Sequence, residues 1–385
     1  MSQPTLRNPA ASSPDAPDID VAIVGGGPGG LAAAQQLGKR GIASVVLEKG
    51  GYPGWMWSKT YESLRLHTGK HLSALPGMPY PSGTSLFPSR GEFMDYLKDY
   101  VAQFSLPLRV GVEVQALERQ ADTWRIKTSE GWVTARAVVV ATGIMSSPLV
   151  PSQLRSESFE GYLIHSSDYR RPSPFLHQRV LVVGVGNSGA EIAAELASAG
   201  VRVAISVRSG VNNVPRSVVG LPSQYLGWAI SWLPRPIQQR LTRTFGLVGA
   251  VVRGGNPIPR KKGFGNCPDV PLIGMKLANA VRSGAIALLP GIDRFTPDGA
   301  TFADGTQHAF DAVILATGYR SSIEWMGAYN ARDACGFAKR RDRVRSLEFP
   351  NLYFIGHNYD GRGGLYNIAV DAKRIARVVL SRQRL

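Results

Sequence analysis

The segment from Val21 to Gly30 reads VAIVGGGPGG and decides the fold. A short apolar run passes directly into glycines spaced Gly-x-Gly-x-x-Gly, and the residues that follow, Leu31 to Gly41, are rich in Ala and Leu. This order predicts a strand, a tight turn and a helix, the unit that binds the pyrophosphate of a dinucleotide. The N-terminus of the helix would offer free N–H groups and a partial positive charge to the phosphates.

A second copy of this pattern lies further along the chain. Arg179 to Gly189 reads RVLVVGVGNSG and leads into another Ala-rich segment, Ala190 to Ala199. Each copy continues through a β-rich stretch to an apolar strand and the tripeptide Ala-Thr-Gly, at Ala141-Thr142-Gly143 and at Ala316-Thr317-Gly318. Short apolar strands that alternate with helices favour parallel sheets. The duplication predicts an α/β fold with two Rossmann-like dinucleotide-binding domains, the second inserted into the first.

The residue that ends the second strand of each copy indicates which dinucleotide binds there. This residue is expected about 20 positions after the glycines, where it meets the ribose of the dinucleotide. In the first copy it is Glu48, whose carboxylate suits the ribose hydroxyls of FAD or NAD and would repel a 2′-phosphate. In the second copy it is Arg208, whose guanidinium suits the 2′-phosphate of NADP. The first site is therefore expected to bind FAD and the second NADPH.

Two cofactors of this kind imply that hydride passes from NADPH to the flavin. Among the enzymes that do this, a disulfide reductase needs a redox cysteine pair. The chain has two cysteines, Cys267 and Cys335, and they form no Cys-x-x-Cys. A monooxygenase needs no protein nucleophile, only a dry pocket beside the reduced flavin. A non-oxygenating NADPH-flavin reductase stays open as a rival.

The segment between the two copies favours the monooxygenase. Phe159 to Arg170 reads FEGYLIHSSDYR, which matches FxGxxxHxxxY followed by a basic residue. It resembles the fingerprint of class B flavoprotein monooxygenases. The Baeyer–Villiger members end this fingerprint in Trp, whereas the ending Tyr169-Arg170 resembles the N- and S-oxygenating branch and the YUCCA branch.

The resemblance to YUCCA-type monooxygenases extends over nearly the whole chain. It is carried by five further segments, which are YESLRLHTGK at 61–70, LPGMPYP at 75–81, VRS at 207–209, LATGYR at 315–320 and DAKRIA at 371–376. The resemblance implies FAD, NADPH, molecular oxygen and a C4a-hydroperoxyflavin intermediate. Plant members of the family convert indole-3-pyruvate to indole-3-acetate by oxidative decarboxylation. The expected reaction is therefore decarboxylation of an aryl 2-oxo acid, with N- or S-oxygenation of a small molecule as the alternative.

The chain departs from the family pattern at three places. Met56 stands where the family usually keeps a tryptophan, although Trp55 and Trp57 flank it. Thr68 lies within a segment that reads His-Leu-Pro-Lys in the family. The glycine-rich C-terminal stretch of the family is replaced by GHNYDGRGG at 356–364. All three regions are expected near the flavin and the substrate, so the cofactors carry over to this chain more directly than the substrate does.

Candidate site residues follow from these motifs. Arg65, His67 and Lys70 are candidates for lining the flavin pocket, with packing or surface roles left equally open. Phe159, Gly161, His165, Tyr169 and Arg170 form the fingerprint linker, where His165 is expected to hold the linker against the NADPH domain rather than transfer protons. No metal site is expected. The expected cofactor-binding residues are Gly25, Gly27, Pro28, Gly29, Gly30, Glu48, Trp57, Leu66, Val114, Ala141, Thr142, Gly184, Gly186, Asn187, Ser188, Gly189, Arg208, Thr317 and Gly318.

The expected domain order divides the chain into four parts. Residues 1–18 form a flexible tail, 19–165 the first part of the FAD-binding domain, and 166–318 the NADPH-binding domain. Residues 319–385 return to the FAD-binding domain. Within the NADPH domain, a helical insertion is expected at about 211–271, and it contains Arg260-Lys261-Lys262.

Charge and composition limit the choice of partners. The chain has 385 residues and a net charge of +16, but its basic residues are spread along the sequence without a nucleic-acid motif. The most apolar later stretch, Tyr225 to Leu233, is too short to span a bilayer. The expected protein acts in the cytoplasm on a small molecule and O2, without nucleic acid or a transmembrane segment. A homodimer and weak contact with a membrane surface stay open.

Overall fold

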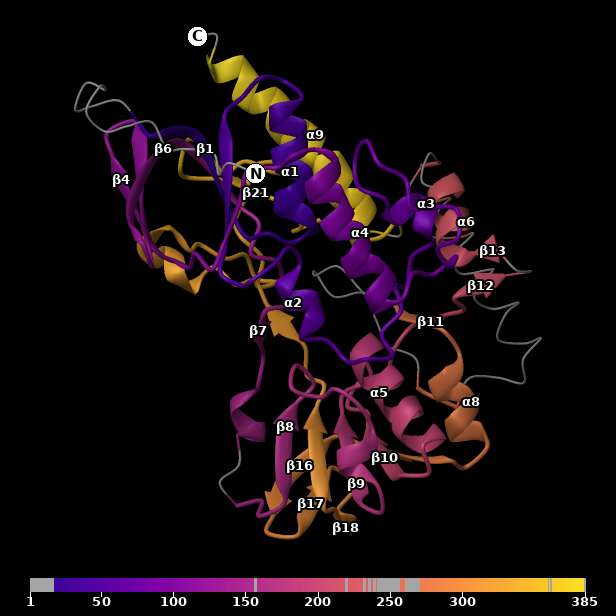
Figure 1. The fold of residues 1–385 in the computed structure, drawn as a ribbon. Helices are drawn as coiled ribbons and strands as arrows, with labels where there is room; N and C mark the ends of the chain where they lie inside the picture. Colours follow the sequence, from indigo (N-terminus) through magenta and orange to yellow (C-terminus); the bar gives the residue numbers. More distant parts are fainter. Residues whose placement is uncertain are drawn as a thin grey trace. The chain divides into compact units, whose positions relative to one another are not determined.

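The computed structural model describes residues 17–155, 158–218, 221–230, 233–234, 237, 240, 257–259, 271–358, 360 and 362–383. These residues form two compact units. The first comprises the described residues of 1–58, 68–147 and 320–385, and the second those of 59–67 and 148–319. Each unit contains one copy of the strand–turn–helix pattern (Figure 1).

The first unit is built on a parallel sheet in the order β3-β2-β1-β6, with β21 also paired to β6. Two antiparallel strands extend the sheet beyond β6 in the order β5-β4. Val21 to Val24 are almost completely buried, as expected for a strand covered on both faces. The strands are β1 (Ile19–Val24), β2 (Ser44–Glu48), β3 (Leu108–Val110), β4 (Val114–Gln120), β5 (Thr123–Thr128), β6 (Gly131–Val140) and β21 (Leu352–Phe354).

Two long helices of this unit, α1 and α9, pack against each other (Figure 1). α1 (Pro28–Gly38) begins directly after the first glycine turn, and α9 (Gly364–Gln383) follows β21. A third, α4 (Arg90–Gln103), begins with a capping box in which Ser89 and Glu92 bond each other's backbone N–H groups. The short helices are α2 (Trp55–Ser58), α3 (Lys70–Ser73) and the 3-10 helix η4 (Glu324–Tyr329).

The second unit repeats the arrangement with a parallel sheet in the order β15-β10-β9-β19-β8. α5 (Asn187–Ser198) begins after the second glycine turn and packs on β9 and β10, and α8 (Lys276–Arg282) packs against α5. The strands are β8 (Tyr162–His165), β9 (Arg179–Val183), β10 (Arg202–Ser206), β15 (Ile286–Leu289) and β19 (Ala312–Leu315), with an antiparallel sheet of β16 (Ile292–Thr296), β17 (Gly299–Phe302) and β18 (Gln307–Ala309).

The segment expected to be a helical insertion is described only in part. Its described residues form short strands as well as the helix α6 (Ser223–Ile230), and Ile237 and Arg240 are also helical. Arg260-Lys261-Lys262 lie outside the described residues. The remaining short elements are β7 (Ser147–Pro148), β11 (Asn213–Val214), β12 (Ser217–Val218), β13 (Leu221–Pro222), β14 (Leu272–Ile273), β20 (Tyr319–Arg320) and the 3-10 helices η2 (Ser152–Leu154) and η3 (Ser173–Phe175).

The bounds of the two units differ from the expected domain bounds at three places, one of which is Tyr319, which belongs to the second unit. Residues 148–165 join the second unit because β8 pairs along its length with β19, and residues 59–67 join it as well. Among the described residues, no helix is both long and apolar enough to cross a membrane.

Candidate cofactor sites

The first glycine turn requires glycine at its two outer motif positions. Gly25 has φ +109°, and a Cβ placed on it would lie 2.6 Å from the carbonyl oxygen of Ala141. A Cβ on Gly30 would lie 1.9 Å from the carbonyl oxygen of Gly25. Around Gly27, by contrast, a Cβ would meet nothing within 4 Å. The outer glycines are therefore required by packing, and the middle one borders open space that a pyrophosphate could enter.

The second turn has the same construction. Gly184 has φ +106°, and its Cβ would lie 2.5 Å from the carbonyl oxygen of Ala316. A Cβ on Gly189 would lie 2.1 Å from the carbonyl oxygen of Gly184, whereas one on Gly186 would again meet nothing within 4 Å. Each turn thus rests on the Ala of an Ala-Thr-Gly tripeptide and leaves its middle glycine open.

The helices that follow the two turns keep their first N–H groups available. α1 has Gly27 as its N-cap and Pro28 in its first turn, and α5 has Gly186 as its N-cap. Neither N-cap residue forms a side-chain hydrogen bond to the helix. A helix N-terminus of this kind favours an anion. Gly29 sits close to Ile355, because a Cβ on it would lie 3.2 Å from Ile355 Cγ2.

Glu48 ends β2 with a carboxylate in a defined orientation. Its Oε2 accepts from the backbone N–H of Gly26 at 2.6 Å, and its Oε1 accepts from that of Gly50 at 2.7 Å. The residue is only 6% exposed. An ionised carboxylate offers about four lone-pair positions, so acceptor capacity remains for two hydroxyl groups.

Arg208 lies two residues beyond β10 and is exposed. Gly291 packs against its stem, because a Cβ on that glycine would lie 3.3 Å from Arg208 Cγ. In the described part of the chain, its guanidinium has no recorded hydrogen bond or ion pair. This cation is available to an anionic ligand, in contrast to the bonded carboxylate of Glu48.

Four other expected cofactor residues form contacts inside the protein. The Thr142 hydroxyl donates to the carbonyl of Ser322 at 2.6 Å, and the Thr317 hydroxyl donates to the carbonyl of Leu149. The Asn187 side chain donates to the carbonyl of Pro271 and accepts from the N–H of Ile273. The ring of Trp57 packs edge-on against Phe93, with centroids 4.6 Å apart. These side chains brace the segments around the turns.

The remaining expected cofactor residues differ in burial. Leu66 and Val114 are buried, with Val114 at the start of β4. Ser188 is half-buried in the first turn of α5. Gly318 contributes its carbonyl oxygen, which accepts from the N–H of Leu149 at 2.9 Å.

His165 ends β8 and also forms a hydrogen bond with the carbonyl oxygen of Gly318. Its Nδ1 accepts from the N–H of Ser167, so the ring proton lies on Nε2, which donates to the carbonyl of Gly318 at 3.1 Å. The ring also packs edge-on against Tyr319. Burial lowers the pKa of His165, although the Gly318 bond and Asp168 act in the opposite direction. A neutral histidine that ties β8 to the segment after β19 suits a positioning role.

The other fingerprint residues also serve packing. A Cβ on Gly161 would lie 2.4 Å from the ring of Phe159, so the glycine makes room for that ring. Tyr169 is 1% exposed and its hydroxyl donates to Glu195 at 2.9 Å. Arg170 donates to the backbone carbonyls of Ser167 and Tyr169.

The three candidates for the flavin pocket have different surroundings. Lys70, in the first unit, donates to the carbonyls of Ser82 and Thr84 at 3.1 and 2.7 Å. Arg65 and His67 belong to the second unit, and Arg65 is exposed. His67 Nδ1 lies 3.8 Å from Glu191 Oε1, and burial lowers its pKa.

Glu191 is the centre of a polar cluster that sequence reasoning missed. It accepts from the hydroxyl of Tyr61 and from Arg216 Nη2, the latter at 2.9 Å. Burial raises the pKa of Tyr61 well above its ordinary value, and Glu191 adds to this. Glu191 and Arg216 also line a cavity of about 270 Å³ together with Lys276. The sequence feature that could have indicated this cluster is the position of Glu191 in the first turns of the helix after the second glycine motif.

Comparison with known proteins agrees with these sites. The family model of pyridine nucleotide-disulphide oxidoreductases matches residues 22–220. A protein of Arabidopsis thaliana named probable indole-3-pyruvate monooxygenase YUCCA4 is 33% identical over 374 residues, which cover 92% of this chain and 88% of that protein. Indole-3-pyruvate monooxygenase YUCCA1 of Oryza sativa subsp. japonica is 34% identical over 360 residues, covering 90% and 85%.

A solved structure of a flavin enzyme also resembles this chain. A flavin-containing monooxygenase from Stenotrophomonas maltophilia has a TM-score of 0.75 and 26% identity, with 95% of this chain and 99% of that chain covered. The chain therefore belongs to the class B flavin-dependent monooxygenases, in their YUCCA-type branch. It is an NADPH-dependent flavin monooxygenase with FAD and NADPH as cofactors, and the expected fold of two Rossmann-like domains is confirmed.

Proposed function

We propose that this monooxygenase oxidatively decarboxylates an aryl 2-oxo acid, indole-3-pyruvate or a relative of it. The observation that carries the proposal is the identity of about one third, over nine tenths of the chain, with relatives named indole-3-pyruvate monooxygenases. The reaction consumes the 2-oxo acid, O2, NADPH and a proton, and it releases the acid shortened by one carbon, carbon dioxide, water and NADP⁺.

We further propose that FAD binds at the first glycine turn and NADPH at the second. In the first unit, Gly25, Gly27 and Gly30 would receive the FAD pyrophosphate and Glu48 its ribose hydroxyls. In the second unit, Gly184, Gly186 and Gly189 would receive the NADPH pyrophosphate and Arg208 its 2′-phosphate. When bound, the reduced flavin supplies the oxygen chemistry. The chain's own contribution is to bind, orient and shield the reactants from water.

The substrate would be an anion, and the second unit contains a cavity with cationic side chains. Lys276 and Arg216 both line it, and the described residues show no ion pair for the Lys276 ammonium. Arg216 is also paired with Glu191, so its charge is partly balanced. A cationic wall would favour the carboxylate of a 2-oxo acid over a neutral sulfide or a protonated amine. This supports the acid as the substrate class.

The test of the substrate is a panel of compounds with NADPH and oxygen. Indole-3-pyruvate, phenylpyruvate, a tertiary amine and a thioether are incubated in parallel, and products are identified by mass. Catalase is present, because free peroxide decarboxylates 2-oxo acids without an enzyme. The expected result is loss of carbon dioxide from one of the acids. If only the amine or the thioether gains an oxygen atom, the chain is an N- or S-oxygenase instead.

The test of the two cofactor sites uses the open glycines. Gly27→Ala and Gly186→Ala both place a methyl group where no protein atom lies within 4 Å, so both variants should fold. We expect Gly27→Ala to lower the FAD content and Gly186→Ala to raise the KM for NADPH with FAD retained. The measurements are released flavin per protein and steady-state kinetics. Gly38→Ala, at another open position in α1, is the control and should change neither. Loss of the same cofactor in both variants would contradict the assignment.

A further inference from the structure

The segment that joins β21 to α9 lies at the edge of the first sheet where the glycine turn lies. β1 and β21 both run parallel to β6, so all three strands end at the same edge. Ile355, the residue after β21, comes within contact distance of a Cβ on Gly29. In open α/β sheets, ligands bind outside the carboxyl ends of the strands. The start of α9 and the residues before it therefore belong to the proposed FAD edge.

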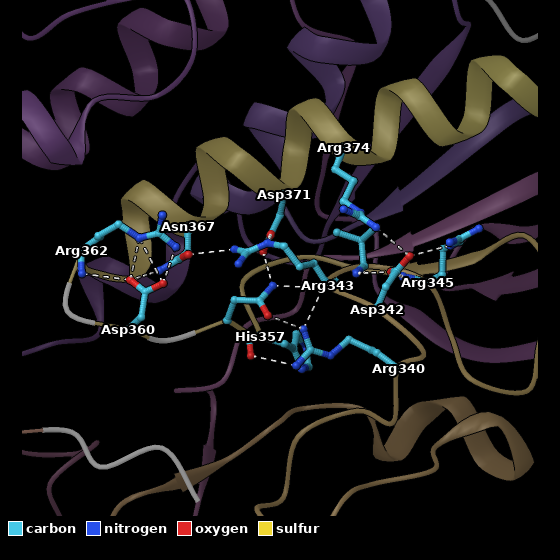
Figure 2. Close-up of polar contacts among 12 residues, drawn as sticks. Arg340, Asp342, Arg343, Arg345, His357, Asp360, Arg362, Asn367, Asp371 and Arg374 are labelled. Atoms are coloured by element: carbon cyan, nitrogen blue, oxygen red, sulfur yellow. Dashed lines mark hydrogen bonds and ion pairs between the residues drawn. The ribbon is translucent and has the colours of Figure 1, made fainter. Parts of the chain in front are cut away.

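A polar network holds the described residues of this segment, 355–358, 360 and 362–363 (Figure 2). At the start of α9, Asp360 is paired with Arg362 and accepts from Asn367 Nδ2 at 3.0 Å. Asn367 in turn accepts from Arg343 Nη2 at 2.8 Å. Arg343 comes from the loop before β21, so one side chain connects that loop to the first turns of α9.

The same guanidinium makes a second contact deeper in the helix. Arg343 Nε donates to Asp371 Oδ1 at 2.9 Å, and Asn358 Nδ2 donates to Asp371 Oδ2 at 2.7 Å. Arg340 Nη1 donates to Asn358 Oδ1 at 3.0 Å. Arg343 thus bonds α9 directly, through Asn367 and Asp371. Because Asn358 bonds the same Asp371, the network also includes the residues that follow β21.

The burial of the network makes Arg343 its critical member. Asp371 and Asn367 are both 0% exposed. Burial raises the pKa of Asp371, whereas Asn358 and Arg343 act in the opposite direction. Arg343 itself is 29% exposed, but its partner Asp371 is buried, so removing Arg343 leaves a buried carboxylate without its cation. The structure relieves such a charge by moving or by taking up a proton. The contact of Arg374 with Asp342 differs, because Arg374 is 43% exposed and contacts of that kind contribute little.

We propose that Arg343 is a positioning residue for FAD, which holds the residues after β21 and the first turns of α9 against the cofactor edge. The role rests on the proposed binding of FAD in the first unit. Arg343 does not touch the reacting atoms. It acts through Asn367 and Asp371, and its loss changes how the flavin is held.

The experiment compares Arg343→Met, Arg343→Lys and Arg374→Met. FAD is titrated into apoprotein by fluorescence, and the absorption spectrum and midpoint potential of the bound flavin are recorded. Loss of the charged hydrogen bond to the buried Asp371 predicts that Arg343→Met raises the Kd for FAD about tenfold or more and shifts the spectrum. Arg343→Lys keeps the charge beside Asp371 but lacks the second arm, so its Kd should rise by a smaller factor. Arg374→Met should match the wild type.

Binding of NADP⁺ serves as the test of folding in each variant. If Arg343→Met loses NADP⁺ binding, Arg343→Lys carries the measurement. An Arg343 variant that binds NADP⁺ and holds FAD with unchanged Kd, spectrum and potential overturns the inference. Gly27→Ala separates the two proposals. Unchanged FAD affinity in Gly27→Ala would contradict the FAD site itself, whereas loss there with no effect at Arg343 would contradict the positioning role alone.

Discussion

Glu48 and Arg208 stand at equivalent points of the two units but are held differently. The carboxylate of Glu48 is bonded by two backbone N–H groups and nearly buried, so its orientation is set before any ligand arrives. The guanidinium of Arg208 is exposed, and Gly291 packs against its stem. The first position suits neutral hydroxyls, and the second suits a phosphate that approaches from solvent.

Replacing Arg208 with Ala should reduce the preference for NADPH over NADH. A charge-assisted bond to phosphate contributes about 1.5–3 kcal/mol, so the KM for NADPH should rise about 10- to 150-fold while that for NADH stays nearly constant. Steady-state kinetics with both cofactors measure the effect. Arg202→Ala, an exposed arginine at the start of β10, is the control and should leave both constants unchanged. An equal loss with both cofactors would show that Arg208 acts structurally.

At the scale of elements, the ends of β8 and β19 are joined by one side chain. His165 donates from Nε2 to the carbonyl of Gly318, and Gly318 also accepts from Leu149. Because burial lowers the pKa of His165, the ring stays neutral at and above its ordinary titration range, so Nδ1 can accept from Ser167 while Nε2 donates to Gly318. The contact positions the segment after β19, beside the second glycine turn.

His165→Ala should uncouple the enzyme without releasing FAD. Without the bond to Gly318, the segment after β19, beside the second glycine turn, is held less well, and reduced flavin should release hydrogen peroxide instead of product. The measurement is peroxide formed per NADPH consumed, together with the flavin content. His308→Ala changes an exposed histidine on β18 and should stay fully coupled. Unchanged coupling in His165→Ala would remove the proposed role of the linker.

At the scale of the whole molecule, each unit repeats one plan. A parallel sheet carries a glycine turn that rests on an Ala-Thr-Gly tripeptide, and the following helix leaves its N–H groups available. Among the described residues, a Cβ on each middle glycine would meet nothing within 4 Å apart from its own chain neighbours. A dinucleotide bound there would add contacts that the unfolded chain cannot make, so each cofactor should stabilise its own unit.

FAD should therefore raise the thermal unfolding temperature of the apoprotein. A ligand at about 100 times its Kd contributes about 2.7 kcal/mol to the free energy of unfolding. The measurement is a calorimetric scan of apoprotein with FAD, with NADP⁺ and with both. The expected result is a shift for each ligand alone and a larger shift for both. In Gly27→Ala the response to FAD should shrink and that to NADP⁺ should remain. If NADP⁺ raises the unfolding temperature of the wild type but FAD does not, binding of FAD to the folded apoprotein is contradicted.

The order of residues along the chain determined the two Rossmann-like units, because strand, turn and helix follow one another within about 30 residues and each carries a local signal. The roles of Glu48 and Arg208 were also inferred from spacing alone. Only the tertiary structure decided that β8 pairs with β19, that Tyr61 bonds Glu191 from 130 positions away, and that Arg343 bonds Asp371 on α9. These contacts join segments that are distant in sequence, and the sequence pattern around a polar side chain such as Arg343 or Tyr61 does not indicate its partner. Their pairing follows from the need to compensate polar groups that folding removes from water.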